Sequence, residues 1–175
     1  SCAGRAASVE LLVDVTGRPE AEVRAALQPA FREGLLGIDP ATGEARFAHD
    51  RVQDAAYSML AAERREELHL RIGRVLASRG GAGGADTTFD AADHLNAGAR
   101  RLRIDDERYE LARLNHRAAL KAKVSAAFGP ALAYLRSGLA ALPPGAWEAE
   151  PELAMTIQRE AAECAYLSGD YALSD

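Results

Sequence analysis

The chain has 175 residues, of which 48% are hydrophobic and 27% charged, a balance that supports a buried core and excludes global disorder. Aromatic residues make up only 6% and alanine is abundant, which favours close-packed helices over a sheet-rich fold. The net charge of −5 argues mildly against nucleic acid as the main partner, and no apolar run is long enough to span a membrane.

The two cysteines, Cys2 and Cys164, lie far apart and belong to no CxxC pair. We expect both to be free thiols in a reducing, cytoplasmic compartment, and no secretory signal opens the chain. The chain has no initiator methionine, and residues 169–175 read as the start of another helix. We therefore interpret the sequence as a piece of a longer protein.

The chain opens with two predicted helices. The first covers residues 5–17 and ends at Gly17, because glycine readily adopts the left-handed conformation that closes a helix. The second covers residues 18–34, with Pro19 near its first turn, where a missing N–H costs little. Pro29 lies inside this helix, and we expect it to kink the last turn.

A hairpin and a third helix are predicted next. Residues 35–38 and 45–48 read as strands, and the segment between them is rich in turn residues. Asp50 is a good N-cap for the following helix. Helical spacing places five apolar residues on one face of that helix: Val52, Ala55, Ala56, Met59 and Leu60. Helix, helix, hairpin and helix is the outline of a winged helix, which we assign to residues 1–60.

Residues 61–104 read as a helical connector. It contains helices at 61–78 and 87–101, separated by the glycine-rich segment 79–84, which we interpret as a flexible linker. The residues expected to face inward are Leu68, Ile72, Val75 and Leu76 in the first helix and Phe89, Ala92 and Leu95 in the second.

Residues 105–175 predict helices at 105–124, 128–142 and 150–167, with Leu111, Leu114, Ala118 and Ala122 facing inward in the first. They also contain an internal repeat with a spacing of 43 residues: Ala118, Ala119, Ala122, Val124, Ser125 and Phe128 match Ala161, Ala162, Ala165, Leu167, Ser168 and Tyr171. The pattern resembles tetratricopeptide (TPR) repeats, although their usual period is about 34 residues. In that pattern Ala131 is the small packing residue, Leu135 and Gly138 face inward, and Pro143 ends the helix. The predicted fold is therefore mainly α, with a small winged-helix subdomain followed by antiparallel TPR-like repeats.

No catalytic or metal-binding constellation is visible. The chain has neither GxxxxGK[ST] nor GxGxxG, and no Lys-Ser/Thr follows its glycine-rich segment. The histidines, which are His49, His69, His94 and His116, lack partners at metal-ligand spacing. Asp93 and His94 are adjacent and should diverge on a helix. We therefore expect no metal site, and no enzyme activity in this piece.

Direct DNA reading by the winged helix is disfavoured by charge. Residues 1–60 carry six arginines and nine acidic residues, and the candidate recognition helix, 19–33, has more acidic than basic side chains. Residues 61–104 contain an arginine cluster, Arg100, Arg101 and Arg103, which we interpret as a solvated helix end.

Five stretches together resemble one protein family: EGLL (33–36), FAHDRVQDAAY (47–57), LHLRIGRVL (68–76), HLNAG (94–98) and YLRSGLAALP (134–143). They resemble large bacterial signalling proteins that join a Ser/Thr kinase-like or other sensory module to an AAA/STAND-type ATPase module. TPR-like helices follow, often with GAF and histidine kinase modules. The segment 49–57 is the most specific part of this resemblance.

The resemblance implies a nucleotide-sensing role for His49. Ala48-His49-Asp50 is similar to the Met-His-Asp motif of STAND ATPases, in which the histidine reaches the β-phosphate of bound ADP and holds the closed state. Asp50 would fix the start of the helix, while Ala48 departs from the usual methionine. ATP or ADP is then a cofactor of the parent protein, with none in this piece. The alternative is that His49 only caps the helix or bonds locally.

By this resemblance the chain is a non-catalytic regulatory and interaction fragment of a multidomain signal-transduction ATPase. It would couple nucleotide state to helical repeats. Its expected partners are the upstream ATPase and downstream signalling modules of the same chain, and a protein bound by the repeats. The alternative is the middle region of an ATP-dependent transcriptional regulator whose DNA-binding output domain lies elsewhere.

Overall fold

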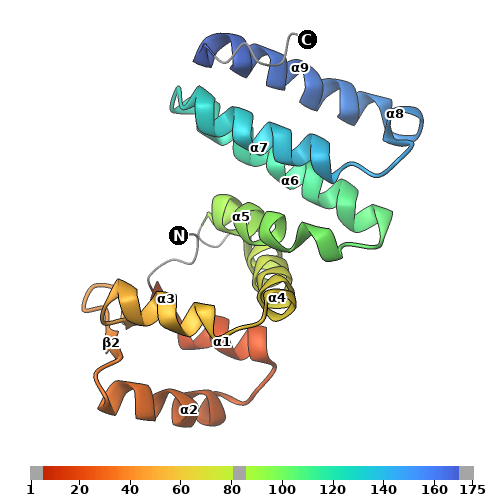
Figure 1. The fold of residues 1–175 in the computed structure, drawn as a ribbon. Coiled ribbons are helices and arrows are strands. Elements are labelled where there is room, and N and C mark those ends of the chain that lie inside the picture. Colours follow the sequence, from red (N-terminus) through yellow and green to blue (C-terminus); the bar gives the residue numbers. More distant parts are fainter. Residues whose placement is uncertain (1–5, 81–85, 170–175) are drawn as a thin grey trace.

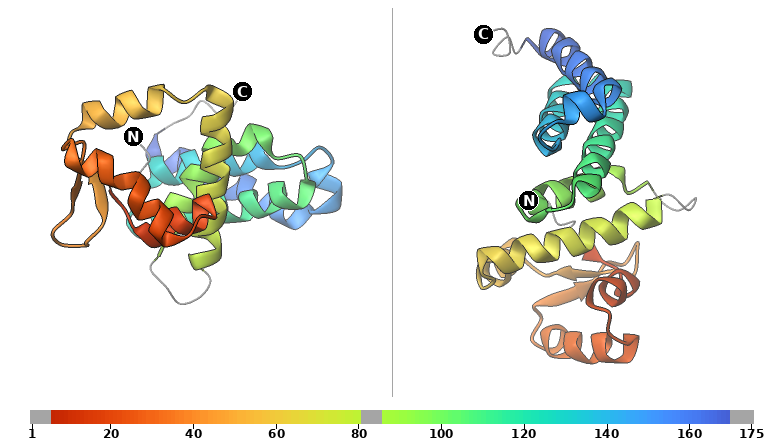
Figure 2. Two further views of the ribbon diagram at one scale, coloured as in Figure 1. Left: turned by 90° about the horizontal axis from the view of Figure 1, so that it is seen from below. Right: turned by 90° about the vertical axis from the view of Figure 1, so that its right-hand side faces the viewer.

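The fold is mainly α, as the sequence predicts, with a small sheet at one end and antiparallel helical repeats stacked beyond it (Figure 1). The computed structural model describes residues 6–80 and 86–169. Cys2, the glycines at 81, 83 and 84, and Tyr171 lie outside the described residues. Seen from the side, the helices rise from the sheet-bearing end in an elongated stack (Figure 2). Within the described part, no helix combines the length and apolar character that crossing a bilayer requires.

Residues 6–60 form what we call the N-terminal unit. Its elements are β1 (Ala6–Ala7), α1 (Val9–Thr16), α2 (Glu20–Arg32), β2 (Leu36–Ile38), β3 (Ala45–Phe47) and α3 (Asp50–Ser58). The strands form an antiparallel sheet in the order β1-β3-β2. Two helices followed by the β2–β3 hairpin give the outline of a winged helix, with β1 as a third strand on the far edge of β3.

The first helix is shorter than predicted. Residues 5–17 were expected to be helical, but Ala6 and Ala7 pair with β3, and α1 begins only at Val9. The reason is local, since the Ser8 side chain accepts a hydrogen bond from the Leu11 N–H at 3.1 Å and caps the helix there. The predicted end is confirmed, because Gly17 adopts a left-handed φ of 67° after Thr16.

The prediction of the N-cap of α3 was wrong. The N-cap position is His49 rather than Asp50, which instead lies in the first turn, where a negative charge suits the helix dipole. The apolar residues predicted to share one face do not form a buried face, because no residue of the helix is buried and Met59, just beyond it, is 86% exposed. The reason is that α3 lies at the edge of the unit, where it packs against β3.

The helical repeats follow. Their elements are α4 (Ala62–Gly80), α5 (Thr88–Gly98), the 3₁₀ turn η1 (Ala99–Arg101), α6 (Asp105–Val124), α7 (Phe128–Ala141), α8 (Ala146–Ala149) and α9 (Pro151–Ser168). Each helix packs on its neighbour, α4 on α5, α5 on α6, α6 on α7 and α7 on α9. Pro143-Pro144-Gly145 ends α7 as predicted, and the short α8 was not foreseen.

The α4–α5 pair, expected to be a connector, packs as tightly as the pairs that follow. A Cβ atom on Gly98 would lie 2.5 Å from Leu70 Cγ, and one on Gly73 would lie 2.6 Å from Leu95 Cγ. The two glycines therefore let the helices approach closely. This contact buries Leu70 and Gly73, while the predicted Leu68, Ile72 and Val75 stay only partly buried. Of the inward predictions for α5, Ala92 is buried, Leu95 is partly buried and Phe89 is exposed.

The main core lies between α6, α7 and α9. Its largest fully buried side chains are Leu111, Asn115, Leu135, Ile157 and Cys164. The four residues predicted to face inward from α6, Leu111, Leu114, Ala118 and Ala122, are all buried. The 43-residue match is not uniform, however, because Ala119 is buried and its counterpart Ala162 is exposed. Among the described helices, α6 has α5 and α7 on either side, whereas α9 packs mainly on α7 and the short α8.

Candidate functional site

His49, the predicted nucleotide sensor, lies at the junction of β3 and α3 with its side chain exposed. Its backbone is extended, with φ −142° and ψ 146°, and its carbonyl accepts hydrogen bonds from the N–H groups of Val52 and Gln53. The side chain makes no capping bond. The imidazole therefore faces outward, at a point where the chain changes from strand to helix.

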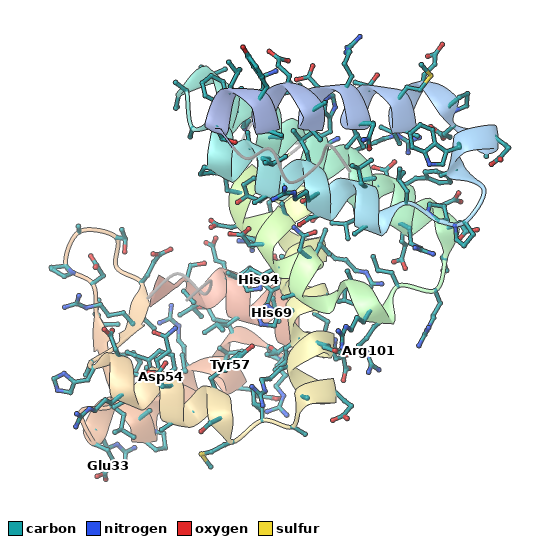
Figure 3. The ribbon with its side chains drawn as sticks, turned by 45° about the horizontal axis from the view of Figure 1, so that its top comes forward. Glu33, Asp54, Tyr57, His69, His94 and Arg101 are labelled. Carbon is teal, nitrogen blue, oxygen red and sulfur yellow. The ribbon has the colours of Figure 1, made fainter. Side chains whose placement is uncertain are left out.

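A second cluster joins the N-terminal unit to the repeats. Tyr57 on α3 places its hydroxyl 3.1 Å from Nε2 of His69 on α4, and the two Nδ1 atoms of His69 and His94 lie 2.9 Å apart (Figure 3). The rings of the two histidines are 4.9 Å apart. The guanidinium of Arg65 lies 4.9 Å above the Tyr57 ring, in cation–π range. One chain of polar contacts thus connects α3, α4 and α5.

The geometry of this cluster limits its protonation. One Nδ1 must donate and the other must accept, so the histidine pair keeps its mutual hydrogen bond with at most one extra proton. Burial lowers the pKa of His69. Burial, followed by the neighbouring His69, lowers the pKa of His94, while Asp90 and Asp93 act in the opposite direction. The uncharged pair is therefore favoured, and acid should strain this contact.

Asp93 and His94 diverge, as the sequence predicts. His94 points toward α4, whereas the Asp93 carboxylate accepts a hydrogen bond from the Tyr134 hydroxyl of α7 at 2.9 Å. Beside them, Asn96 and Asn115 exchange two hydrogen bonds of 2.8 Å between α5 and α6. Asn115 is fully buried, so this reciprocal amide pair fixes how the first helix pair sits on the second.

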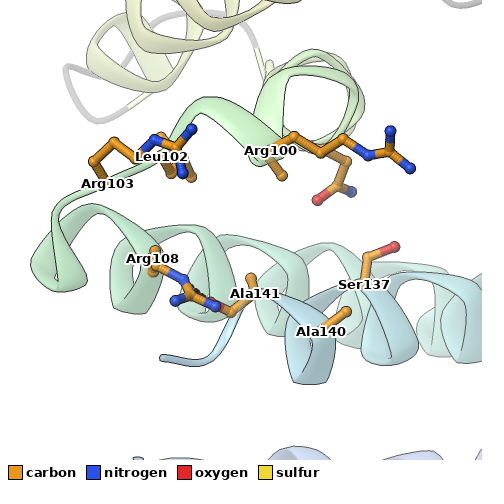
Figure 4. A pocket seen from close by; sticks show the side chains of 9 residues that line it. Arg100, Leu102, Arg103, Arg108, Ser137, Ala140 and Ala141 are labelled. Atoms are coloured by element: carbon orange, nitrogen blue, oxygen red, sulfur yellow. Dashed lines mark hydrogen bonds between the residues drawn. The ribbon is translucent and has the colours of Figure 1, made fainter. Parts of the chain in front are cut away.

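A groove of about 440 Å³ opens between the end of α5 and the α6–α7 pair (Figure 4). Arg100 and Arg103 line it from one side and Arg108 from the other. The remaining lining residues are small or uncharged: Asn96, Ala99, Leu102, Ser137, Ala140 and Ala141. Arg101 does not line the groove, and its charge helps to lower the pKa of Glu67, an effect that comes mainly from Arg64.

Sequence reasoning missed both constellations. Tyr57, His69 and His94 come from three helices, and nothing in their spacing relates them. The arginines at 100 and 103 were visible as a cluster but interpreted as a solvated helix end, since the opposing Arg108 and the end of α7 approach only through folding. No group of three His, Cys, Asp or Glu side chains that could hold a metal ion occurs among residues 6–80 and 86–169.

Two further titratable groups lie in the repeat core. Cys164 is a buried free thiol, and burial raises its pKa. His116 has a buried Nε2 atom with no hydrogen-bond partner among the described residues, and burial lowers its pKa. The charges of Lys123 and Glu160 act on the pKa of both groups, and neither group lines the groove described above. We assign both to the packing of α6 and α9 in the repeat core.

Comparison of the chain with known protein families, with curated proteins and with solved structures finds no match.

Proposed function

We propose that this chain is a non-catalytic coupling module of a signal-transduction ATPase, which passes the nucleotide state of a neighbouring module to helical repeats that bind a protein. The observation that carries the proposal is that α4 belongs to both parts of the molecule. It packs against α1 of the N-terminal unit and against α5 of the repeats. A shift of the N-terminal unit would therefore act directly on the first repeat pair.

The Tyr57–His69–His94 chain supports the same role. It ties α3, the helix that starts at His49, to α4 and α5 by side-chain contacts. Only the length of α3 separates the candidate sensor from this junction. A ligand held by His49 would favour one position of α3. Because the junction connects α3 to α4 and α5, the repeats would respond to that change in position. Such coupling requires packed elements that can adopt two discrete arrangements.

An outward-facing imidazole suits a phosphate contact. A histidine N–H can donate to a phosphate oxygen in either the neutral or the protonated state. Because its imidazole nitrogens are not used for helix capping, His49 can make such a contact without weakening α3. This part of the proposal depends on an ATPase module that supplies the remaining nucleotide contacts.

The surface of α2 supports protein rather than DNA as the partner. Arg24 forms an ion pair with Glu20 at 2.7 Å, and Arg32 donates to Gln28 at 3.0 Å. The two arginines of the candidate recognition helix are thus engaged by neighbours on the same helix. A DNA-reading helix uses such cations to neutralise phosphates.

The test is the substitution His49→Ala in the full-length protein. We expect weaker ADP binding and a higher basal signalling output, because the contact that holds the closed state is lost. Arg18→Ala, another exposed side chain of the N-terminal unit, is the matched control and should leave both quantities unchanged. If His49→Ala changes neither ADP affinity nor output, the sensor role is wrong.

A further inference from the structure

Several arginines elsewhere in the described structure form ion pairs with acidic side chains. Each of the arginines in the following ion pairs faces an acidic side chain: Arg24–Glu20, Arg64–Glu67, Arg74–Glu107, Arg79–Asp14 and Arg113–Glu150. Arg100 and Arg103 form no ion pair with any described residue, although the chain as a whole carries a net charge of −5. Two cations held at one groove without a counter-charge favour the approach of an anion.

Arg108 provides a third cation in a fixed position. Its Nε and Nη2 atoms donate to the carbonyl oxygens of Ala141 and Leu142, each at 2.9 Å. These two bonds hold the guanidinium at the end of α7 and leave three of its five N–H groups for another acceptor. On the opposite wall, the buried Leu102 anchors the backbone between Arg100 and Arg103. The donors are therefore carried by ordered segments, which lowers the entropic cost of binding.

The uncharged part of the groove lining suits an extended peptide. Ala99, Ala140 and Ala141 are small and leave room for a backbone, while Asn96 and Ser137 add polar groups. Asn96 uses one amide hydrogen and one oxygen lone pair in its pairing with Asn115. A primary amide keeps a second donor and further acceptor capacity, the set that a peptide N–H and C=O require.

We propose that this groove binds an acidic peptide segment of a protein partner, with carboxylates held by Arg100, Arg103 and Arg108. Guanidinium groups match carboxylates in bidentate geometry, and arginines on both walls suit several carboxylates along a chain. Guanidinium groups also bind phosphate in bidentate geometry, so competition by pyrophosphate is the measurement that distinguishes the two anions. The inference rests on the proposed protein-binding role of the repeats and names the chemistry of the partner.

The probe is fluorescein-labelled hexaglutamate, titrated against this chain by fluorescence anisotropy at low salt, about 50 mM NaCl. We expect saturable binding that weakens as salt is added. Arg100→Gln with Arg103→Gln should weaken it by at least about tenfold, because charge-assisted hydrogen bonds are lost. The affinity of the Arg100→Lys, Arg103→Lys protein should lie between those of the wild type and the glutamine variant, because charge is kept and bidentate geometry is lost. All four substitutions are at exposed positions, and circular dichroism confirms that each variant is folded.

The matched control is Arg18→Gln with Arg51→Gln, which makes the same charge change at exposed positions of the N-terminal unit. It should alter affinity by less than about twofold. Equal weakening by both glutamine pairs, or no binding by the wild type, would overturn the inference. Displacement by inorganic pyrophosphate at concentrations well below those of unlabelled hexaglutamate would replace it with a phosphate site. None of these outcomes bears on ADP affinity in the His49→Ala protein, so the two proposals fail separately.

Discussion

The N-terminal unit and the helical repeats differ in how they are held together. The unit buries only three hydrophobic side chains among its described residues, Val15, Val23 and Ala45, whereas the two hydrophobic clusters of the molecule are built from buried residues of the repeats. Strand pairing and contacts with α4 must therefore contribute much of the stability of the unit. A loosely packed unit joined to a well-packed one is the arrangement expected of a part that moves in a switch.

The largest expected effect comes from the repeat core. Leu135 is fully buried, and Leu135→Ala should lower the free energy of unfolding by about 2–5 kcal/mol, through lost burial and the cavity left behind. Val23→Ala in the N-terminal unit should lower it by only about 1 kcal/mol, because fewer buried methyl groups are removed and the unit has fewer buried side chains. Urea unfolding measures both. Equal losses would show that the unit is packed as firmly as the repeats.

The second effect tests the close approach of α4 and α5. In Gly98→Ala the new Cβ would lie 2.8 Å from the backbone oxygen of Glu66, so the helices must separate, at a cost of about 1–3 kcal/mol. Gly129→Ala in α7 is the control, since nothing lies within 4 Å of its Cβ position. That change should be neutral or stabilise by up to about 1 kcal/mol. Thermal unfolding measures both variants. Equal shifts of the two melting temperatures would contradict the close packing of α4 on α5 at Gly98.

The sequence predicted the repeats better than the N-terminal unit, for a physical reason. Long amphipathic helices can be recognised from the spacing of their apolar residues, and the inward residues predicted for α6 are all buried. Short elements depend on contacts made elsewhere, as Ala6 and Ala7 show by joining a strand far along the chain. The same reason explains why a local motif suggested His49 while Tyr57, His69 and His94 were not connected, because no local pattern encodes a junction of three helices.

The third effect concerns the junction and its pH dependence. The pKa values of His69 and His94 are lowered in the folded protein, so the unfolded chain binds more protons as pH falls below about 6.5. Their contribution to stability is thus complete above that pH and is lost as pH falls through the folded pKa values. The urea midpoint should therefore be lower at pH 5.5 than at pH 7.5.

The comparison protein carries His69→Gln with His94→Gln, which cannot titrate. Its midpoint should change less between the two pH values, even if it is less stable at pH 7.5. His116 is present in both proteins and its pKa is lowered too, so its contribution cancels. A pH dependence as steep as that of the wild type would show that the histidine pair does not control the junction in acid.

The smallest expected effect compares an ion pair that joins the N-terminal unit to the repeats with an ion pair inside the repeats. Arg79 and Asp14 join α4 to α1 with side chains 35% and 48% exposed, whereas Lys123 and Glu160 join α6 to α9 with side chains 19% and 15% exposed. Double-mutant cycles with Arg79→Gln and Asp14→Asn should give a coupling of about 0.2–1 kcal/mol that disappears in about 1 M NaCl. Lys123→Met with Glu160→Gln should give a larger coupling that persists in salt, since solvent screens a less exposed pair less. A salt-resistant Arg79–Asp14 coupling would mean that the N-terminal unit is bound firmly to the repeats and would weaken the case for a moving part.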